Sequence, residues 1–382
     1  MHKVTQITHG PKHHFFGYYD KWQWDESQRY LLTLEVDFAD RSPRPTDVAQ
    51  VCLIDVQDNC QLHPISKTRA WCWQQGSMLQ WVPGSPRTIV HNDLIGDRFV
   101  SVFVDIDTGA RRVLPRPIYT ISHDGRYALS LNFARLAVTR PGYGYNGLID
   151  QWNDELHPAE DGIYLMDLAM GEHRLIVSID QLARSNPEAS MAGVKHWVNH
   201  LLFSPDGKRF IFLHRWDNQK GLFHTRLYTA SLDGSELFCS RLQRGSHFIW
   251  YDNTRILIWG YTEDQGYGYY LIEDQTDHME LVGKGVLTRD GHCNFAPGSD
   301  WFVTDEYPDA NNMRPLILYH LREKTHRVLE RFYSPPEKKG ELRCDLHPRW
   351  SRDGRYICID TFCEGTRQMC LVDVGAIIEG SS

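Results

Sequence analysis

The sequence predicts an all-β fold, a seven-bladed β-propeller with four-stranded blades, and three observations support this prediction. Short apolar strands separated by Gly, Asp or Ser turns recur from one end of the chain to the other. The repeat is roughly 40 to 55 residues long, the spacing typical of propeller blades. Helical periodicity is almost absent, with single turns expected only at 179–183 and 374–378. We therefore expect residues 1–382 to form one propeller domain.

The clearest unit spans residues 199–236. An apolar strand at 201–203 is reversed by the turn Ser204-Pro205-Asp206-Gly207, and 210–214 forms the next strand. Pro presets one turn position and Gly tolerates a positive φ, which gives the turn a physical basis. Residues 225–231 alternate in polarity as a third strand.

Six further units repeat this order of elements around a turn. Their turns lie at 24–27, 84–85, 123–125, 251–253, 297–299 and 352–354. Their strands are expected at 30–36 and 51–56; 79–83, 88–91 and 101–106; 119–122, 127–131 and 162–168; 248–250, 256–260 and 269–273; 293–296, 301–305 and 315–320; and 348–351, 356–361 and 369–374.

Two long loops, 139–161 and 180–195, interrupt the repeat. Loops of this length inside a compact domain are often functional, and in a propeller they would rim one face of the central channel. Simple tolerance of an insertion is the alternative.

Composition excludes several functions. The net charge of -8 and the lack of a long basic block argue against a nucleic-acid partner. No stretch is apolar enough for a signal peptide or a membrane span, so we expect a cytoplasmic protein with no membrane partner, unless a signal has been removed. The 9 cysteines are scattered, several within strands, as expected of buried thiols rather than of a disulfide framework.

Four histidines stand at equivalent points of four consecutive units, just before an inner strand. They are His200, His247, His292 and His347. Inner strands of a propeller line its central channel, so these side chains should converge near the axis. A single histidine at such a point would more often be structural, but four in register favour a functional site.

A cysteine three residues before the last of these histidines suggests a metal centre. His247, His292, Cys344 and His347 would supply three imidazoles and one thiolate, a reasonable tetrahedral zinc set. Cys293 is an alternative sulfur ligand. The other interpretation is that Cys344 and His347 only pack in the closing blade.

Polar residues at strand ends are candidates for substrate contacts. The second strands of three units end in His91-Asn92, in Asn132 and in His214-Arg215, and Arg226 begins an outer strand. An arginine there can be a solvated edge charge, or it can turn inward and hold a carboxylate through two hydrogen bonds.

The dense run from His13 to Lys21, which includes Tyr18 and Tyr19, has two interpretations of equal weight. It is either a strand that closes the ring beside the last blade or a wall of the substrate site.

At these residues the sequence resembles a known family. The stretch 199–373 is similar to the oligogalacturonate lyases, and more loosely to propeller-type ulvan lyases; the first three units match only in layout. The resemblance implies cleavage of a uronate-containing glycan by β-elimination and a metal in the central region. It places Arg226 at the carboxylate, His247 near a functional histidine, and His292 and His347 at metal ligands. Two departures stand out: Cys344 replaces a Gln, which favours zinc over manganese or calcium, and Arg349 replaces a further His ligand.

The resulting hypothesis is a lyase for an acidic oligosaccharide or polysaccharide. Arg226 would bind the uronate carboxylate, helped by Asn92 or Asn132, and Arg215 would contribute to the same site. A neutral His200 or His91 would remove the proton, and Tyr18 or Tyr19 would protonate the leaving oxygen. The metal would either hold the blades together near the axis as a structural ion or take part in catalysis.

Two rival functions remain. A propeller without catalytic activity would bind a glycan or a protein. A glycoside hydrolase would need two carboxylates facing the channel, and Glu35, Asp37 and Asp305 stand at strand ends without an evident pairing.

Overall fold

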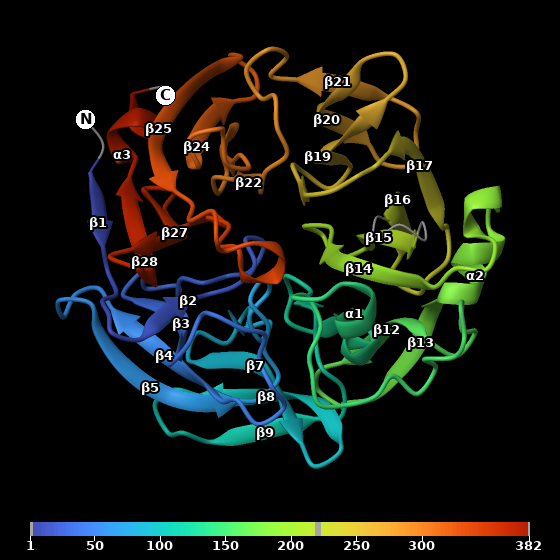
Figure 1. Cartoon of the computed structure of the whole chain (residues 1–382), viewed down its shortest axis with the longest axis horizontal. Coiled ribbons are helices and arrows are strands. Elements are labelled where there is room, and N and C mark those ends of the chain that lie inside the picture. Colours follow the sequence, from blue (N-terminus) through green and yellow to red (C-terminus); the bar gives the residue numbers. More distant parts are fainter. Residues whose placement is uncertain (1–2, 218–222, 381–382) are drawn as a thin grey trace.

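The computed structural model describes residues 3–217 and 223–380. Its strands form antiparallel sheets arranged as a ring around a central axis, the predicted β-propeller (Figure 1). Five sheets have four strands. A sixth has eight, because β17 and β19 share the single pair Gln243 with Tyr261, which joins two four-stranded units. Within the described residues the strands thus divide into seven four-stranded units.

The strand bounds follow the predicted order. The first three units comprise β2 (His13–Phe15), β3 (Tyr30–Val36), β4 (Ala49–Asp55) and β5 (Gln61–Thr68); β6 (Gln80–Trp81), β7 (Thr88–Ile95), β8 (Arg98–Asp105) and β9 (Arg111–Leu114); and β10 (Thr120–Ile121), β11 (Tyr127–Ser130), β12 (Gly162–Asp167) and β13 (His173–Ser178). The next two comprise β14 (His196–Phe203), β15 (Arg209–Asp217), β16 (Phe223–Ser231) and β17 (Phe238–Gln243); and β18 (Phe248–Trp250), β19 (Arg255–Thr262), β20 (Gly266–Glu273) and β21 (Met279–Val282). The last two comprise β22 (Asn294–Phe295), β23 (Trp301–Asp305), β24 (Met313–His320) and β25 (Thr325–Tyr333); and β26 (Arg349–Trp350), β27 (Tyr356–Cys363), β28 (Thr366–Asp373) and β1 (Val4–Gln6).

The N-terminal strand closes the ring. β1 pairs with β28, Val4 opposite Val372, and so completes the last unit with a strand from the other end of the chain. The expectation that the run from His13 to Lys21 might be this closing strand is wrong, because β2 pairs with β3 as the first strand of the first unit. Residues 16–21 continue from β2 into the centre of the ring.

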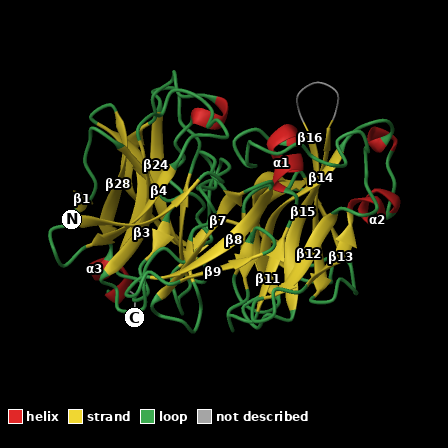
Figure 2. Cartoon of the chain, turned by 90° about the horizontal axis from the view of Figure 1, so that it is seen from below, coloured by secondary structure: helices red, strands yellow, loops and turns green. Residues whose placement is uncertain are grey.

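Three short α-helices and two 3-10 turns interrupt the strands. They are α1 (Phe133–Thr139), α2 (Ile179–Arg184), α3 (Gly375–Glu379), η1 (Ala189–Met191) and η2 (Gly340–Leu342). Figure 2 shows α1 and α3 on opposite faces of the ring. The expected single turns became α2 and α3, but α1 was not predicted, because 132–135 was interpreted as a strand end. Asn132 instead caps α1: its side-chain oxygen accepts hydrogen bonds from the backbone N–H groups of Ala134 and Arg135.

A repeated turn reverses the inner strands as predicted. In each case a serine hydroxyl donates to an aspartate two residues on, and the following glycine has a positive φ. The three turns are 122–125, 204–207 and 351–354, with serine-to-aspartate distances of 2.6, 2.8 and 2.6 Å and glycine φ values of 70°, 69° and 71°.

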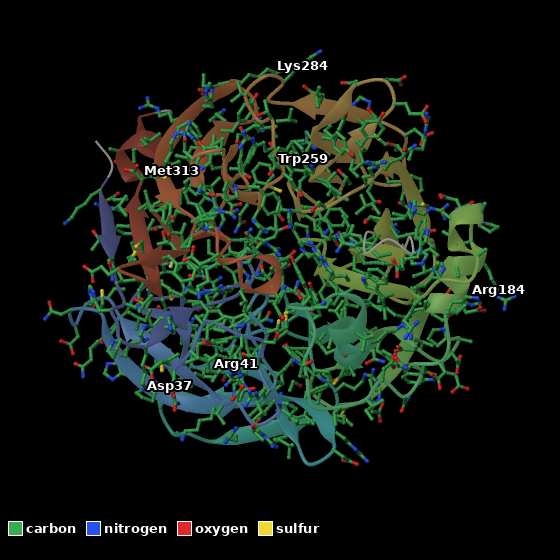
Figure 3. All side chains as sticks on the ribbon, in the orientation of Figure 1. Asp37, Arg41, Arg184, Trp259, Lys284 and Met313 are labelled. Atoms are coloured by element: carbon green, nitrogen blue, oxygen red, sulfur yellow. The ribbon has the colours of Figure 1, made fainter. Side chains whose placement is uncertain are left out.

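The core consists of apolar layers between neighbouring sheets. Val90 and Phe103 of the second unit pack in one cluster with Ala128 and Met166 of the third. Each inner sheet thus buries both faces, which accounts for its long apolar runs. Figure 3 shows side chains throughout the ring, with charged groups such as Lys284 at its outer edge.

Among the described residues no helix has the length and apolar character needed to cross a membrane. All nine cysteines are free thiols, and six of them are buried.

Candidate functional site

The four histidines in register lie together at the centre of the ring. The ring centroids of His247 and His292 are 4.0 Å apart, and those of His292 and His347 are 4.3 Å apart. His200 joins them through Tyr18, whose ring lies 4.9 Å from His200 and 5.3 Å from His347. The expected convergence of these side chains is therefore present. His200 and His347 also have left-handed backbone conformations, with φ of 54° and 43°, which non-glycine residues adopt mainly where the surrounding structure holds them.

The segment after β2 runs through this centre. The Tyr19 hydroxyl donates to the Phe248 carbonyl at 2.8 Å and accepts from the Phe248 N–H at 2.9 Å, and Asn294 donates to the Tyr19 carbonyl at 2.8 Å. Tyr19 thereby links the N-terminal segment to the fifth and sixth units, and its hydroxyl proton is committed to a backbone carbonyl. Tyr18, its neighbour, lines the cavity described below.

His200 belongs to a buried charge cluster rather than to the cavity wall. Its Nε2 lies 3.3 Å from Asp20 Oδ2, and Lys21 Nζ lies 2.7 Å from Asp20 Oδ1. Burial alone would raise the pKa of Asp20, but Lys21 and His200 hold it below its usual value. Burial lowers the pKa of His200 to about 4, so its imidazole is neutral at physiological pH.

A group of three buried side chains has the donor set of a metal site. One ligand atom each from His292, Asp345 and His347 lies within 4.8 Å of the others. His292 Nδ1 is 2.8 Å from Asp305 Oδ1, which directs the Nε2 lone pair away from that carboxylate. Nε2 of both histidines is buried and has no hydrogen-bond partner among the described residues. Buried imidazole nitrogens without a hydrogen-bond partner are suited to donate their lone pairs to a metal cation.

Asp345 is held from behind by two arginines. Arg343 Nε donates to its Oδ2 at 2.7 Å, and Arg314 Nη2 lies 2.8 Å from Oδ1 without hydrogen-bond geometry. Burial opposes ionisation, yet these two cations keep the pKa of Asp345 well below its usual value. The carboxylate is therefore charged and still has one oxygen without a hydrogen bond. Two imidazoles and a carboxylate fit zinc, manganese or a similar divalent ion better than calcium, which prefers oxygen ligands alone.

This group differs from the predicted set of His247, His292, Cys344 and His347. Asp345 belongs to it, whereas Cys344, Cys293 and His247 do not. Cys344 Sγ makes only a weak 4.0 Å contact with the Asp345 carbonyl, and burial raises the pKa of the thiol to about 12, which disfavours the thiolate that a metal needs. His247 directs Nδ1 to Asp290 Oδ1 at 2.9 Å. The departure at Arg349 is also structural: its Nη2 donates to Asp360 Oδ1 at 2.6 Å.

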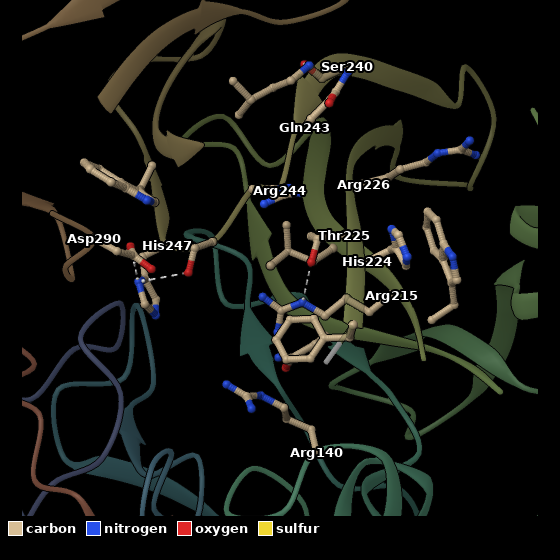
Figure 4. A pocket seen from close by; sticks show the side chains of 18 of the residues that line it. Arg140, Arg215, His224, Thr225, Arg226, Ser240, Gln243, Arg244, His247 and Asp290 are labelled. Atoms are coloured by element: carbon tan, nitrogen blue, oxygen red, sulfur yellow. Dashed lines mark hydrogen bonds and ion pairs between the residues drawn. The ribbon is translucent and has the colours of Figure 1, made fainter. Parts of the chain in front are cut away.

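A basic cavity of about 980 Å³ opens beside the histidines. Five arginines line it, Arg140, Arg215, Arg226, Arg241 and Arg244, against only two carboxylates, Glu188 and Asp290. In Figure 4 the side chains of Arg140, Arg215 and Arg244 extend toward the open space, with His247 and Asp290 on the facing wall. The excess of positive charge indicates an anionic ligand. Both long loops of the sequence contribute to the wall, through Tyr143 and Glu188.

Arg140 and Arg215 are cations without a carboxylate partner among the described residues. Arg215 is 6% exposed, and its Nε donates to Thr225 Oγ1 at 3.2 Å. Both guanidinium groups lie 4.7 Å from the centre of the Phe223 ring. Burial, followed by the charge of Arg140, lowers the pKa of Arg215 to about 10. A buried cation beside a second, half-buried cation is costly without an anion, and a bound carboxylate would remove this cost.

Arg226 lies on the same cavity but is already paired. Its guanidinium forms an ion pair with Glu188, donates to the Asn186 carbonyl at 2.6 Å and lies 5.3 Å from the Trp216 ring centre. In Figure 4 it extends away from Arg215 and His247. Its assignment to the uronate carboxylate stays a prediction, and Arg140 and Arg215 are better placed for that contact.

Three other candidates have structural partners away from the cavity. His91 contacts Ser66 Oγ at 2.8 Å through Nε2 and the Asn92 carbonyl at 2.9 Å through Nδ1. The Asn92 side chain donates a hydrogen bond to the Ile118 carbonyl through Nδ2 and accepts one from the Ile118 N–H through Oδ1. Asn132, besides capping α1, donates to Asp150 at 2.8 Å and to Asp161 at 2.9 Å. None of the three lines the cavity, so we give them no role in the reaction proposed below.

The buried carboxyl group of Asp161, which accepts a hydrogen bond from Asn132, leads to a stability prediction. Burial raises the pKa of Asp161 to about 6, so the folded protein holds this proton more tightly than the unfolded chain does. Stability from this group is therefore present below about pH 4 and is lost as pH rises to about 6, a change of about 3 kcal/mol. We expect Asp161→Asn to remove this loss. Urea unfolding of both proteins between pH 4 and 8 tests it, and parallel stability curves would contradict it.

Comparison with known proteins supports the fold. No protein-family model and no curated protein sequence matches the chain. Among solved structures, an oligogalacturonate lyase from Vibrio parahaemolyticus is 15% identical with a TM-score of 0.67, covering 98% of this chain and 94% of that one. An oligogalacturonate lyase in complex with manganese is 14% identical with a TM-score of 0.69, covering 97% and 92%. The β-propeller domain of the trilobed protease from Pyrococcus furiosus is 9% identical with a TM-score of 0.53, covering 93% and 95%. These likenesses establish the β-propeller and leave the activity open.

Several residues of the site were not found from the sequence. Asp345 stands two residues before His347, but the spacing of Cys344 and His347 favours a thiolate ligand in its place. Asp290 and Arg140 carried no signal, since each becomes important only through side chains from other units. Tyr143 lies in the long loop 139–161, and that loop was the only pointer to it.

Proposed function

We propose that this protein is a lyase that cleaves a uronate-containing oligosaccharide or polysaccharide by β-elimination. One observation carries the proposal: a single cavity is lined both by Arg140 and Arg215, which have no carboxylate partner among the described residues, and by the hydrogen-bonded dyad of His247 and Asp290. This arrangement has an anion-binding wall on one side and a proton acceptor on the other, which are the two requirements of the reaction.

The two arginines would stabilise the negative charge that develops on the substrate carboxylate during the reaction. Removing the proton beside a carboxylate places charge on the carboxylate oxygens, and donors already in place lower the barrier. Arg215 is fixed by Thr225 and by Phe223, so it needs little reorganisation when the substrate binds. Arg140 supplies a second guanidinium for the same group.

His247 is the base in this proposal. Its Nδ1 is oriented by Asp290, with Ser246 Oγ also 3.2 Å away, which leaves Nε2 as the nitrogen that can accept a proton. Burial lowers its pKa, so the ring is neutral and able to act as a base. We prefer it to His200, which does not line the cavity, and to His91, whose two nitrogens already have partners.

The group of His292, Asp345 and His347 would hold a divalent cation, zinc or manganese. When bound, the ion would supply positive charge next to His247, whose ring is in contact with that of His292. The acidic substrate and the metal are further proposals from the same geometry, and a manganese complex is described for an oligogalacturonate lyase of similar fold.

The direct test is incubation with digalacturonate, ulvan-type oligosaccharides and other glucuronate-bearing glycans. We expect the ultraviolet absorbance of an unsaturated uronate to appear with at least one of them. Folded, metal-loaded protein that produces no such absorbance but binds one of these glycans would instead identify a binding propeller without catalytic activity.

A further inference from the structure

The loop after α1 and the segment after η2 are joined by one hydrogen bond between side chains. Arg343 Nη2 donates to the Tyr143 hydroxyl at 2.7 Å, although the two residues are 200 positions apart in the chain. Tyr143 is 3% exposed and lines the basic cavity. It therefore presents a phenol to the same space as Arg215 and His247.

The direction of this hydrogen bond is fixed by chemistry. A guanidinium has donors and no acceptor, so the Tyr143 oxygen must accept from Arg343. The phenol proton then remains free, because no other partner of this hydroxyl exists among the described residues. A proton transferred from Tyr143 would leave a phenolate 2.7 Å from a guanidinium, where charge-assisted hydrogen bonding stabilises it.

The contact is held in place by its surroundings. Gln74 donates from Nε2 to the Arg343 carbonyl at 3.0 Å and from its backbone N–H to the Gly142 carbonyl at 3.1 Å, so one residue fixes both segments. Gly142 has a φ of +88°, and a Cβ there would lie 2.6 Å from Glu341 Cβ, so only glycine permits this close approach. Arg367 also donates to the Arg343 carbonyl, at 2.9 Å.

We propose that Tyr143 is the general acid of the elimination, with Arg343 as its positioning residue. This assignment rests on the proposed lyase function and deepens it. His247 takes the proton from the carbon beside the carboxylate, and that electron pair forms the double bond to the adjacent carbon. The bond from that carbon to the glycosidic oxygen breaks, and the oxygen takes the Tyr143 proton. Proton transfer from the imidazolium to the phenolate through solvent restores both groups.

The assignment differs from the sequence prediction of Tyr18 or Tyr19 for this role. The Tyr19 proton is bound by the Phe248 carbonyl, so Tyr19 has none to give. Tyr18 also lines the cavity. Among the described residues, however, no guanidinium or ammonium group donates a hydrogen bond to its hydroxyl, so a phenolate there would lack this stabilisation. Tyr267 also lines the cavity, and its hydroxyl accepts from Arg244 Nη1 at 2.5 Å, but Tyr267 is 52% exposed. Among the described tyrosines of the cavity wall, Tyr143 is the buried one whose oxygen accepts from a guanidinium and whose proton is free.

The experiment compares two leaving groups with the same unsaturated product. One substrate is the uronide found active in the glycan panel, whose sugar alkoxide needs a proton to leave. The other is its analogue with fluorine at the same carbon, since fluoride leaves without protonation. We expect Tyr143→Phe to slow the first reaction about 100-fold or more and to leave the second nearly unchanged. Tyr333→Phe, a half-exposed tyrosine on β25, is the matched control and should affect neither.

The outcomes separate the two proposals. Wild-type protein inactive on every uronide refutes the lyase function itself. An active wild type whose Tyr143→Phe variant is equally impaired on both substrates, or on neither, refutes the acid assignment alone; a selective loss in Tyr18→Phe would transfer the role there. Should Tyr143→Phe fail to fold, 3-fluorotyrosine at position 143 keeps the hydroxyl. It should then change the rate only for the substrate with the sugar leaving group.

Discussion

Replacing Arg215 by Met is expected to lower kcat/KM on an active uronide by about 100- to 1,000-fold, while the protein becomes no less stable. The loss follows from removing a fixed donor at the charge that develops in the transition state, an effect of about 3 to 4 kcal/mol. Stability is expected to rise by about 1 kcal/mol, because Met keeps most of the apolar volume and removes a buried cation next to Arg140. Kinetics and thermal unfolding of the same preparation measure both effects.

The control distinguishes this arginine from the one that the sequence favoured. Arg226→Met should lower stability, since it breaks the ion pair with Glu188 and the contact with the Asn186 carbonyl, and should affect kcat/KM much less. Arg215→Lys keeps the charge but not the two-pronged donor, so partial activity is expected. If Arg226→Met proved more damaging to turnover than Arg215→Met, the original assignment of Arg226 to the carboxylate would be restored.

The fold was predictable because its information is local and repeated. Each unit carries its own strand, turn and strand, and a turn such as Ser204 to Gly207 folds by contacts within a few residues. The convergence of the four histidines was predictable for the same reason, since equal positions in equal units must face one axis. Helix α1 escaped because its signal is a single capping residue, Asn132, which also fits the end of a strand.

The roles of individual side chains were far less predictable. Tyr143 and Arg343 meet across 200 positions, and Arg140 reaches the cavity from a loop whose path no local pattern gives. The same holds for Arg226, whose assignment to the carboxylate stays a prediction: its sequence context does not show that its guanidinium pairs with Glu188. A repeat therefore tells which positions face the axis, but the partners of each side chain come from the tertiary structure.

Asp345→Asn is expected to abolish the binding of a divalent metal, whereas Cys344→Ala is expected to leave it intact. Asparagine keeps the shape of the carboxylate but removes the charge, and His292 and His347 alone offer only two nitrogens to the ion. We expect affinity for zinc or manganese to fall at least about 100-fold. Asp345→Asn also leaves Arg314 and Arg343 near each other without their shared anion, which should cost about 3 to 5 kcal/mol of folding free energy.

His347→Gln separates these two effects, because it removes a metal ligand and leaves the arginines paired with Asp345. Metal content after dialysis and the metal-induced rise in Tm provide the measurement. A metal at 100 times its Kd should stabilise wild type and Cys344→Ala by about 2.7 kcal/mol and His347→Gln hardly at all. The predicted thiolate ligand would be reinstated by the reverse pattern, in which Cys344→Ala loses the metal-induced rise and Asp345→Asn retains it. The two sets differ at neighbouring residues, so this pair of variants decides whether a thiolate or a carboxylate completes the site.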